Sequence, residues 1–195
     1  MKYLFNSIVE FISQESLVET SRTLNEEPSK VSSAMHAIIS SLLEAIIEKD
    51  EKKKLGLFLK CIGSSHMLLH VSDLFSMELS FHKQRISAKF LTYLFKNNVE
   101  EYYSVIASSS GITKESAKEI VPKVTLLVAA FLGEKLISGI RLSDLIEQLK
   151  DEKNDFKKHT PPKAFKVIKK SSTPTFFIQK LWATFHARSV KPLFN

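Results

Sequence analysis

The sequence has little cysteine and little glycine, and both shortages narrow the class of protein. Its single cysteine, Cys61, cannot form a disulfide within the chain, so nothing indicates a disulfide-stapled secreted scaffold. This fits a reducing compartment, and we expect a cytoplasmic protein. Only five glycines occur in 195 residues, which disfavours a fold rich in β-hairpins because hairpin turns need residues with positive φ.

Long uncharged runs are also missing from the chain. The longest segment without Asp, Glu, Lys or Arg covers the thirteen residues 31–43, whereas a membrane-spanning helix needs about 20. Residues 1–13 contain one lysine and several apolar side chains, but polar residues interrupt them and no small-residue cleavage site follows. We therefore expect neither a signal peptide nor a transmembrane segment.

Hydrophobic residues recur at helical spacing along the chain, and no segment alternates with a period of two. With 44% hydrophobic and 25% charged residues, the composition is that of an ordinary globular protein. We predict an all-α fold, a multi-helix bundle that forms one self-sufficient core. The predicted helices span residues 3–12, 17–24, 26–47, 55–62, 66–78, 84–96, 99–109, 113–138, 162–170 and 174–186.

The segment 113–138 is predicted to be the central helix of this bundle. Thr113 can cap its N-terminus, and Glu115 lies in the first turn, where the helix dipole favours an anion. Residues 124–132 carry no charge and are apolar on nearly every face, which is typical of a buried helix. Pro122 lies within the helix and is expected to bend it, at a cost of about 3 kcal/mol unless the fold uses the bend.

A weak internal repeat at an offset of 88 residues relates the two halves of the chain. Apolar positions pair at this offset, and Glu27 with Glu115 and Lys30 with Lys118 are identical. Each copy has a short helix, a capped turn and a long apolar helix, with Asn25 expected to cap the first long helix. Two such hairpin units would surround the proline-kinked helix. Chance matching of amphipathic helices explains the same pairs equally well.

Several motifs around the central helix have a recognisable order. The turn Ser110-Gly111-Ile112 precedes the helix, Val121-Pro122 lies inside it, and Leu145-Ile146 follows in a charged helix that a proline ends. Over residues 14–162 the chain resembles the bacterial YidB-like family, domain of unknown function 937. The first copy departs from the family pattern because Ala34 stands where proline is frequent. The resemblance implies an all-helical fold and supplies no activity, cofactor or catalytic residue.

Two groups of residues could carry chemistry, a histidine-aspartate cluster and the single cysteine, but each also has a plain structural explanation. His66, His70 and Asp73 have the spacing of one helical face and could together hold a metal ion. The glutamate of a zincin motif is missing, because Met67 follows the first histidine, and a solvated polar face explains the same residues. Cys61 lies in an apolar run and is expected to be buried and inert. We assign no metal, cofactor or catalytic residue.

Charge is very unevenly distributed. Residues 156–195 contain nine Lys or Arg and no Asp or Glu, whereas residues 1–155 contain 19 basic and 21 acidic residues. We predict a helical bundle domain, 1–155, and a basic, aromatic-rich C-terminal segment, 156–195, of short helices docked on the bundle. The candidate residues for contact with nucleic acid or another anion are Lys163, Lys166, Lys169, Lys170, Lys180, Arg188, Lys191, Phe176, Phe177 and Trp182.

Four interpretations fit this C-terminal segment. Its apolar side chains can dock on the bundle and leave the lysines solvated, or they can bind a protein partner or a second copy of the chain. Lysines neutralise phosphates and aromatic rings stack on bases, which indicates nucleic acid. The same composition suits an anionic membrane surface. We favour docking and expect a non-enzymatic structural or protein-interaction module, with nucleic-acid or anionic-surface binding as the alternative.

Overall fold

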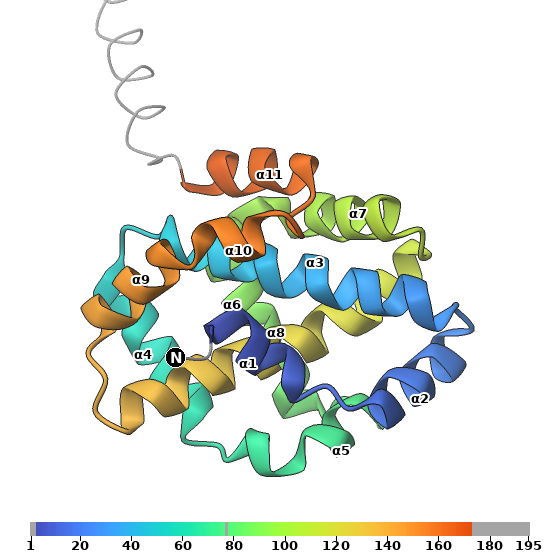
Figure 1. The fold of residues 1–195 in the computed structure, drawn as a ribbon, viewed down its shortest axis with the longest axis horizontal. Coiled ribbons are helices and arrows are strands. Elements are labelled where there is room, and N and C mark those ends of the chain that lie inside the picture. The colour runs from blue at the N-terminus through green and yellow to red at the C-terminus, as the bar shows by residue number, and fades with distance from the viewer. Residues whose placement is uncertain (1–2, 77, 173–195) are drawn as a thin grey trace, which may run out of the picture.

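The computed structural model describes residues 3–76 and 78–172, and this part of the chain is all-α without any β-strand (Figure 1). The fold class predicted from the sequence is confirmed. The helices are α1 (Leu4–Glu10), α2 (Gln14–Leu24), α3 (Pro28–Ile47), α4 (Lys52–Gly63), α5 (Val71–Ser76), α6 (Phe81–Phe95), α7 (Val99–Ser110), α8 (Lys114–Ile137), α9 (Leu142–Asp151), α10 (Lys153–Lys157) and α11 (Pro162–Ser172), with 3-10 turns η1 (Met67–His70) and η2 (Lys96–Asn98).

Helix α8 is the centre of the bundle, as the apolar pattern predicts. The Thr113 hydroxyl accepts a hydrogen bond from the Ser116 N–H at 3.0 Å, and the helix ends at the cap residue Ser138. Every residue from Val124 to Gly133 is buried. The helix continues through Pro122, and the Ser87 hydroxyl of α6 donates to the Pro122 carbonyl at 3.0 Å. The expected bend at Pro122 stays a prediction.

Helix α3 is the second long core helix. Pro28 is its first residue, a position where the missing N–H has no intrahelical partner to lose. Asn25, expected to cap this helix, instead ends α2 in the left-handed conformation with φ of 53°, so that prediction was wrong. By length and composition α3 could cross a membrane, but 78% of its apolar window is buried within the protein. Its apolar surface is thus used in packing.

The predicted hairpin units correspond to α2–α3 and α7–α8. In each unit a short helix ends at a left-handed residue, Asn25 or Gly111. The N-cap of the long helix, Glu27 or Thr113, lies two residues later, and the helix begins at the next residue. These positions align at an offset of 86 residues rather than 88. The Glu26 carboxylate accepts a hydrogen bond from the Thr113 N–H at 2.6 Å, which holds the two N-terminal ends together.

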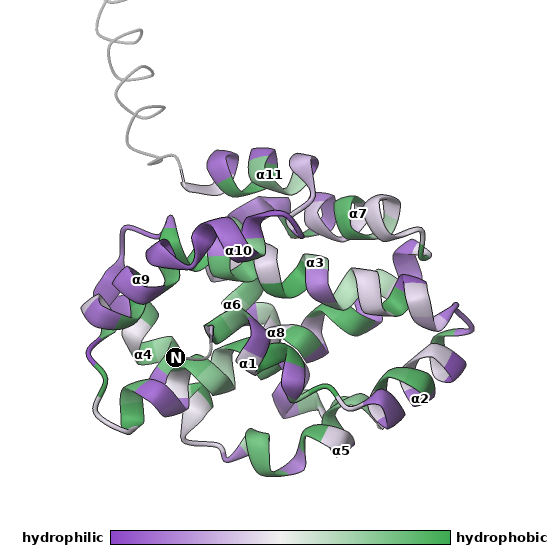
Figure 2. Cartoon of the chain, in the orientation of Figure 1, coloured by the Kyte–Doolittle hydropathy of each residue, from purple (hydrophilic) through white to green (hydrophobic). Residues whose placement is uncertain are grey.

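The helix that follows each unit in the chain packs on the other unit. Helix α4 follows α3 in the chain but packs mainly on α8, whereas α9 follows α8 and packs on α3 (Figure 1). Figure 2 shows hydrophilic residues along the outer sides of α9 and α10 and hydrophobic residues along the core helices. The exchange buries apolar faces from both units in one continuous core.

Helices α4 and α8 cross so closely that only glycine fits at the crossing. A Cβ atom on Gly63 would lie 2.5 Å from the Gly133 carbonyl carbon, and one on Gly133 would lie 2.8 Å from the Gly63 nitrogen. The Leu59 carbonyl also borders this point. Real Cβ atoms do not approach backbone atoms so closely, which makes both glycines part of the packing.

The helix expected over residues 66–78 is shorter and divided. His66 adopts the left-handed conformation with φ of 53°, which interrupts an α-helix, and η1 then leads into α5. Leu69 of η1 is exposed, whereas four other apolar side chains of this stretch are buried in the core. They are Met67, Val71, Leu74 and Phe75.

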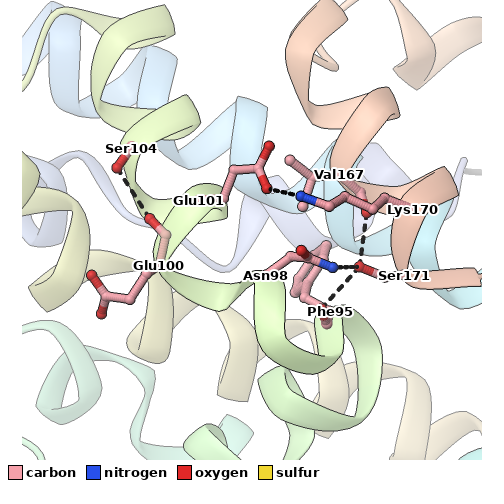
Figure 3. A network of polar contacts seen from close by, with 8 residues as sticks. All are labelled: Phe95, Asn98, Glu100, Glu101, Ser104, Val167, Lys170 and Ser171. Carbon is pink, nitrogen blue, oxygen red and sulfur yellow. Dashed lines mark hydrogen bonds and ion pairs between the residues drawn. The ribbon is translucent and has the colours of Figure 1, made fainter.

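Helix α11 packs on α3, α6 and α7, as Figure 3 shows for its C-terminal turn. The buried Ser171 hydroxyl accepts from the Asn98 amide at 3.0 Å and can donate to the Phe95 carbonyl at 2.9 Å. The Lys170 ammonium pairs with the Glu101 carboxylate at 2.8 Å. Helix α10 bridges the predicted boundary at residues 155/156, and its Phe156 side chain is fully buried. The C-terminal segment is therefore built onto the bundle as far as residue 172.

Candidate functional site

A groove of about 760 Å³ lies between α4, α6 and the α3–α4 connection, beside the last residues of α11. Its floor is apolar and is formed by Phe58 of α4 and by Ala88 and Tyr93 of α6. The C-terminal residues of α11, Ser171 and Ser172, form part of its wall. We call this site the Tyr93 groove.

The floor is held in place by aromatic packing. The Phe58 and Tyr93 rings lie 5.1 Å apart between centroids, and the buried Phe90 ring lies 5.7 Å from Phe58. The Tyr93 hydroxyl donates a hydrogen bond to the Glu51 carbonyl at 3.0 Å. Burial, and to a lesser degree the charge of Glu51, raises the pKa of the Tyr93 phenol to about 12. The phenol is therefore neutral near neutral pH, and its hydrogen bond to Glu51 orients the ring.

Lysine side chains gather around the Tyr93 ring. The Lys49 and Lys54 ammonium groups lie 5.1 and 5.3 Å from its centroid, within the range of a cation–π interaction. Lys49 is only 7% exposed. Burial, and then the neighbouring charge of Lys96, lowers its pKa. Carboxylates partly offset these cations, since Glu51 pairs with Lys54 at 3.5 Å and the charges of Glu51 and Asp50 raise the pKa of Lys49.

The rim of the groove carries both signs of charge. Arg85 and Lys89 lie four residues apart on α6, which places them on one helical stripe, and Lys96 lines the groove just beyond the end of this helix. Opposite them, the α3–α4 connection contributes Glu48, Asp50 and Glu51. An apolar floor with a charged rim of both signs can bind a complementary surface. Within the described residues, no group of three His, Cys, Asp or Glu side chains has an arrangement that could hold a metal ion.

The predicted anion-contact residues do not converge on the groove. Lys163, Lys166, Lys169 and Lys170 are exposed on α11, whose buried residues are Ala164, Val167, Ile168 and Ser171. The alternation is that of an amphipathic helix docked on a core, with its lysines in solvent. The remaining predicted contacts, namely Lys180, Arg188, Lys191, Phe176, Phe177 and Trp182, lie outside the described residues.

The histidine and cysteine candidates also differ from expectation. His66, His70 and Asp73 do not share one helical face, because His66 precedes η1 in a left-handed conformation. His70 Nδ1 lies 3.7 Å from an Asp73 oxygen, and both side chains are largely exposed. Cys61 is exposed, so its expected burial was wrong. The buried face of α4 is formed by Leu55, Leu59 and Ile62. Cys61 does not lie on this face and is exposed.

The groove residues were not singled out from the sequence, although two signals were present. The run 48–54 is densely charged, and basic residues recur at helical spacing over 85–96 around Tyr93. Neither pattern shows that the two segments, more than thirty residues apart, meet in space. Comparison with protein-family models, with curated proteins and with solved structures gave no match to this chain.

Proposed function

We propose that this protein is a non-enzymatic interaction module that binds a protein partner in the Tyr93 groove. The observation that carries the proposal is the combination of an aromatic floor, Phe58 and Tyr93, with a rim of both charge signs. Aromatic residues and arginine are enriched in the centres of protein interfaces, and polar groups surround them. A partner would insert an apolar side chain onto the floor and pair its charges with the rim.

The mixed rim favours a protein over nucleic acid at this groove. Glu48, Asp50 and Glu51 line the same space as the basic residues and would repel a run of phosphates. A protein segment that carries both acidic and basic residues can match both sides. The expected partner surface has an acidic residue facing the α6 stripe and a basic residue facing the α3–α4 connection.

A second candidate function is nucleic-acid or anionic-surface binding through the C-terminal segment. The exposed lysines of α11 support it, since Lys163 and Lys166 form no ion pair with any described residue. In this alternative the lysines contact phosphates while the apolar face of α11 stays on the bundle. Binding would weaken steeply as salt concentration rises.

The experiment compares the full chain with two arginine variants. Ala88→Arg places a long side chain on the groove floor and adds a positive charge, whereas Ser104→Arg makes the same charge change on the exposed side of α7. Proteins that cross-link to this chain in the cells of origin are identified by mass spectrometry. Each candidate partner is then titrated against the purified chain. We expect one partner that binds wild type and Ser104→Arg with equal affinity and loses at least tenfold with Ala88→Arg, about 1.4 kcal/mol.

Nucleic acid binding is measured with the same three proteins by fluorescence anisotropy at two salt concentrations. An added arginine strengthens or leaves unchanged an interaction that depends on phosphates. A partner set that Ala88→Arg does not alter, together with salt-sensitive nucleic-acid binding by all three proteins, would reject the groove in favour of the alternative. Membership of the YidB-like family, which rests on motifs such as Ser110-Gly111-Ile112, stays a prediction and supplies no activity to test.

A further inference from the structure

A separate polar pocket of about 420 Å³ lies between the N-terminal half of α3 and the connection from α10 to α11. It shares no lining residue with the Tyr93 groove. Its lining consists entirely of side chains that can donate hydrogen bonds, from two segments far apart in the chain. They are Ser29, Ser32, Ser33, His36, Lys158 and His159.

The three serine hydroxyls of this pocket differ from other helical serines in the protein. Elsewhere a helical serine usually donates to a carbonyl three or four residues earlier, as Ser41 does to Ala37 at 2.6 Å. The same holds for Ser21, Ser104, Ser108, Ser109 and Ser172. Within the described chain, the hydroxyls of the pocket serines form no hydrogen bond, so their O–H groups are available to a ligand.

The two imidazoles stack against each other at one side of the pocket. The His36 and His159 ring centroids lie 5.5 Å apart, and the Phe5 ring of α1 lies 5.1 Å from His159. Burial lowers the pKa of both histidines, and the charges of His36 and Lys158 lower that of His159 further. Near neutral pH each ring is therefore uncharged. The His36 ring already forms a hydrogen bond with the Ser32 backbone, so the N–H donor available to a ligand is that of His159.

No carboxylate lines the pocket, and its formal charge comes from Lys158. Three neighbouring lysines of these segments have other partners. Lys30 pairs with Glu27 at 2.8 Å, the Lys157 ammonium lies over the Phe165 ring at 5.7 Å, and Lys153 pairs with the buried Glu44. Helix α1 contributes only the Phe5 ring to the stack. The pocket thus presents one cation, three hydroxyls and two imidazoles without a competing anion.

We propose that this pocket binds a small tetrahedral oxyanion of the phosphate class, as free inorganic phosphate or as a phosphomonoester group. The Lys158 ammonium supplies the opposing charge, and hydroxyl and imidazole donors surround the remaining oxygens. A bound anion favours the protonated form of a neighbouring histidine, so affinity rises as pH falls. The volume of about 420 Å³ is more than enough for one such group.

Binding is followed by NMR of the histidine side chains of the full chain as inorganic phosphate is added at constant ionic strength. We expect saturable shifts of His36 and His159, while exposed His70 and His82 stay unchanged. Lys158→Gln should weaken phosphate binding about tenfold, whereas Lys157→Gln, the same change one residue earlier, should alter it less than about twofold. Phosphoserine is titrated in parallel, and the tighter of the two ligands identifies the source of the anion.

The pH dependence is measured with sulfate, because phosphate itself gains a proton in this range. Sulfate should bind severalfold more tightly at about pH 5.5 than at about pH 7.5. Absence of histidine shifts up to about 10 mM phosphate would overturn the proposal, since weaker binding is not a site. So would equal losses in Lys157→Gln and Lys158→Gln, or sulfate affinity that does not change with pH.

Discussion

Replacing Gly133 by alanine is expected to destabilise the protein strongly, because the α4–α8 crossing leaves no room for a Cβ atom. The added carbon would lie 2.8 Å from both the Gly63 nitrogen and the Leu59 carbonyl carbon. These are backbone atoms of a packed helix, so they cannot rotate away as a side chain would. Helices α4 and α8 must separate, and the buried α4 side chains lose contact with the core.

The expected magnitude follows from two opposing terms. Overpacking of a core costs about 1–3 kcal/mol, and a clash with backbone belongs at the upper end. Alanine gains about 1 kcal/mol over glycine in helix propensity. The net loss for Gly133→Ala is therefore about 2 kcal/mol. For a chain of this length that corresponds to a fall in Tm of about 4–8 °C.

Gly56→Ala is the matched control on α4. Its Cβ would meet the Leu142 Cδ2 atom at 3.3 Å, which is the end of a flexible side chain. We expect this variant to be unchanged or stabilised by up to about 1 kcal/mol. Both variants are compared with wild type by urea unfolding of the full chain, with circular dichroism as the signal. A Gly133→Ala variant as stable as Gly56→Ala would refute the close crossing.

Three further predictions concern polar contacts. Ser171→Ala removes the buried hydroxyl between Asn98 and Phe95 and should cost about 1–2 kcal/mol in urea unfolding, whereas Ser172→Ala should cost far less; equal losses would contradict this. Lys153→Met leaves the buried Glu44 carboxylate without its 2.8 Å partner and should lower the free energy of unfolding by about 2 kcal/mol or more. Adding Glu44→Leu should recover most of this stability. If it does not, the buried charge is not the cause of the loss. The Thr113 N–H lowers the pKa of Glu26, so its stabilisation is present above about pH 4.5 and is lost as pH falls through the lower folded-state pKa. Glu26→Gln should therefore lower Tm slightly at pH 7 and not at about pH 3, and a pH-independent effect would exclude the carboxylate.

Predictions that rest on local pattern agree well with the structure. The central helix begins after Thr113 and ends at Ser138, and a helix ends at Gly111, because capping side chains and glycine act within one turn. Asn25 shows the limit of the same signal. Asparagine serves either as an N-cap or as a left-handed C-cap, and here it ends α2. The next residue, Glu26, accepts a hydrogen bond from the Thr113 N–H, 87 residues away, and this contact has no signal in the local sequence.

The candidate sites were harder to predict because their residues come together only through helix packing. Nothing local indicates that Lys49 faces Tyr93, or that His36 stacks on His159 from the other end of the chain. Cys61 was misplaced for a related reason. The prediction took every residue of the apolar run around Cys61 to be buried. A helix with one buried face instead directs some of its residues to solvent.

By itself the sequence determined that this protein is helical, where most helices lie, and that residues 124–132 of the central helix are buried. That information is local: it resides in periodicity, caps and glycine or proline positions within a few residues of each other. Only the tertiary structure decided that α4 and α9 exchange between the two units, that Gly63 and Gly133 meet, and that two polar sites form between distant segments. Each of these depends on which buried faces fit together, and amphipathic helices with similar stripes can pack in several ways until side-chain volumes select one.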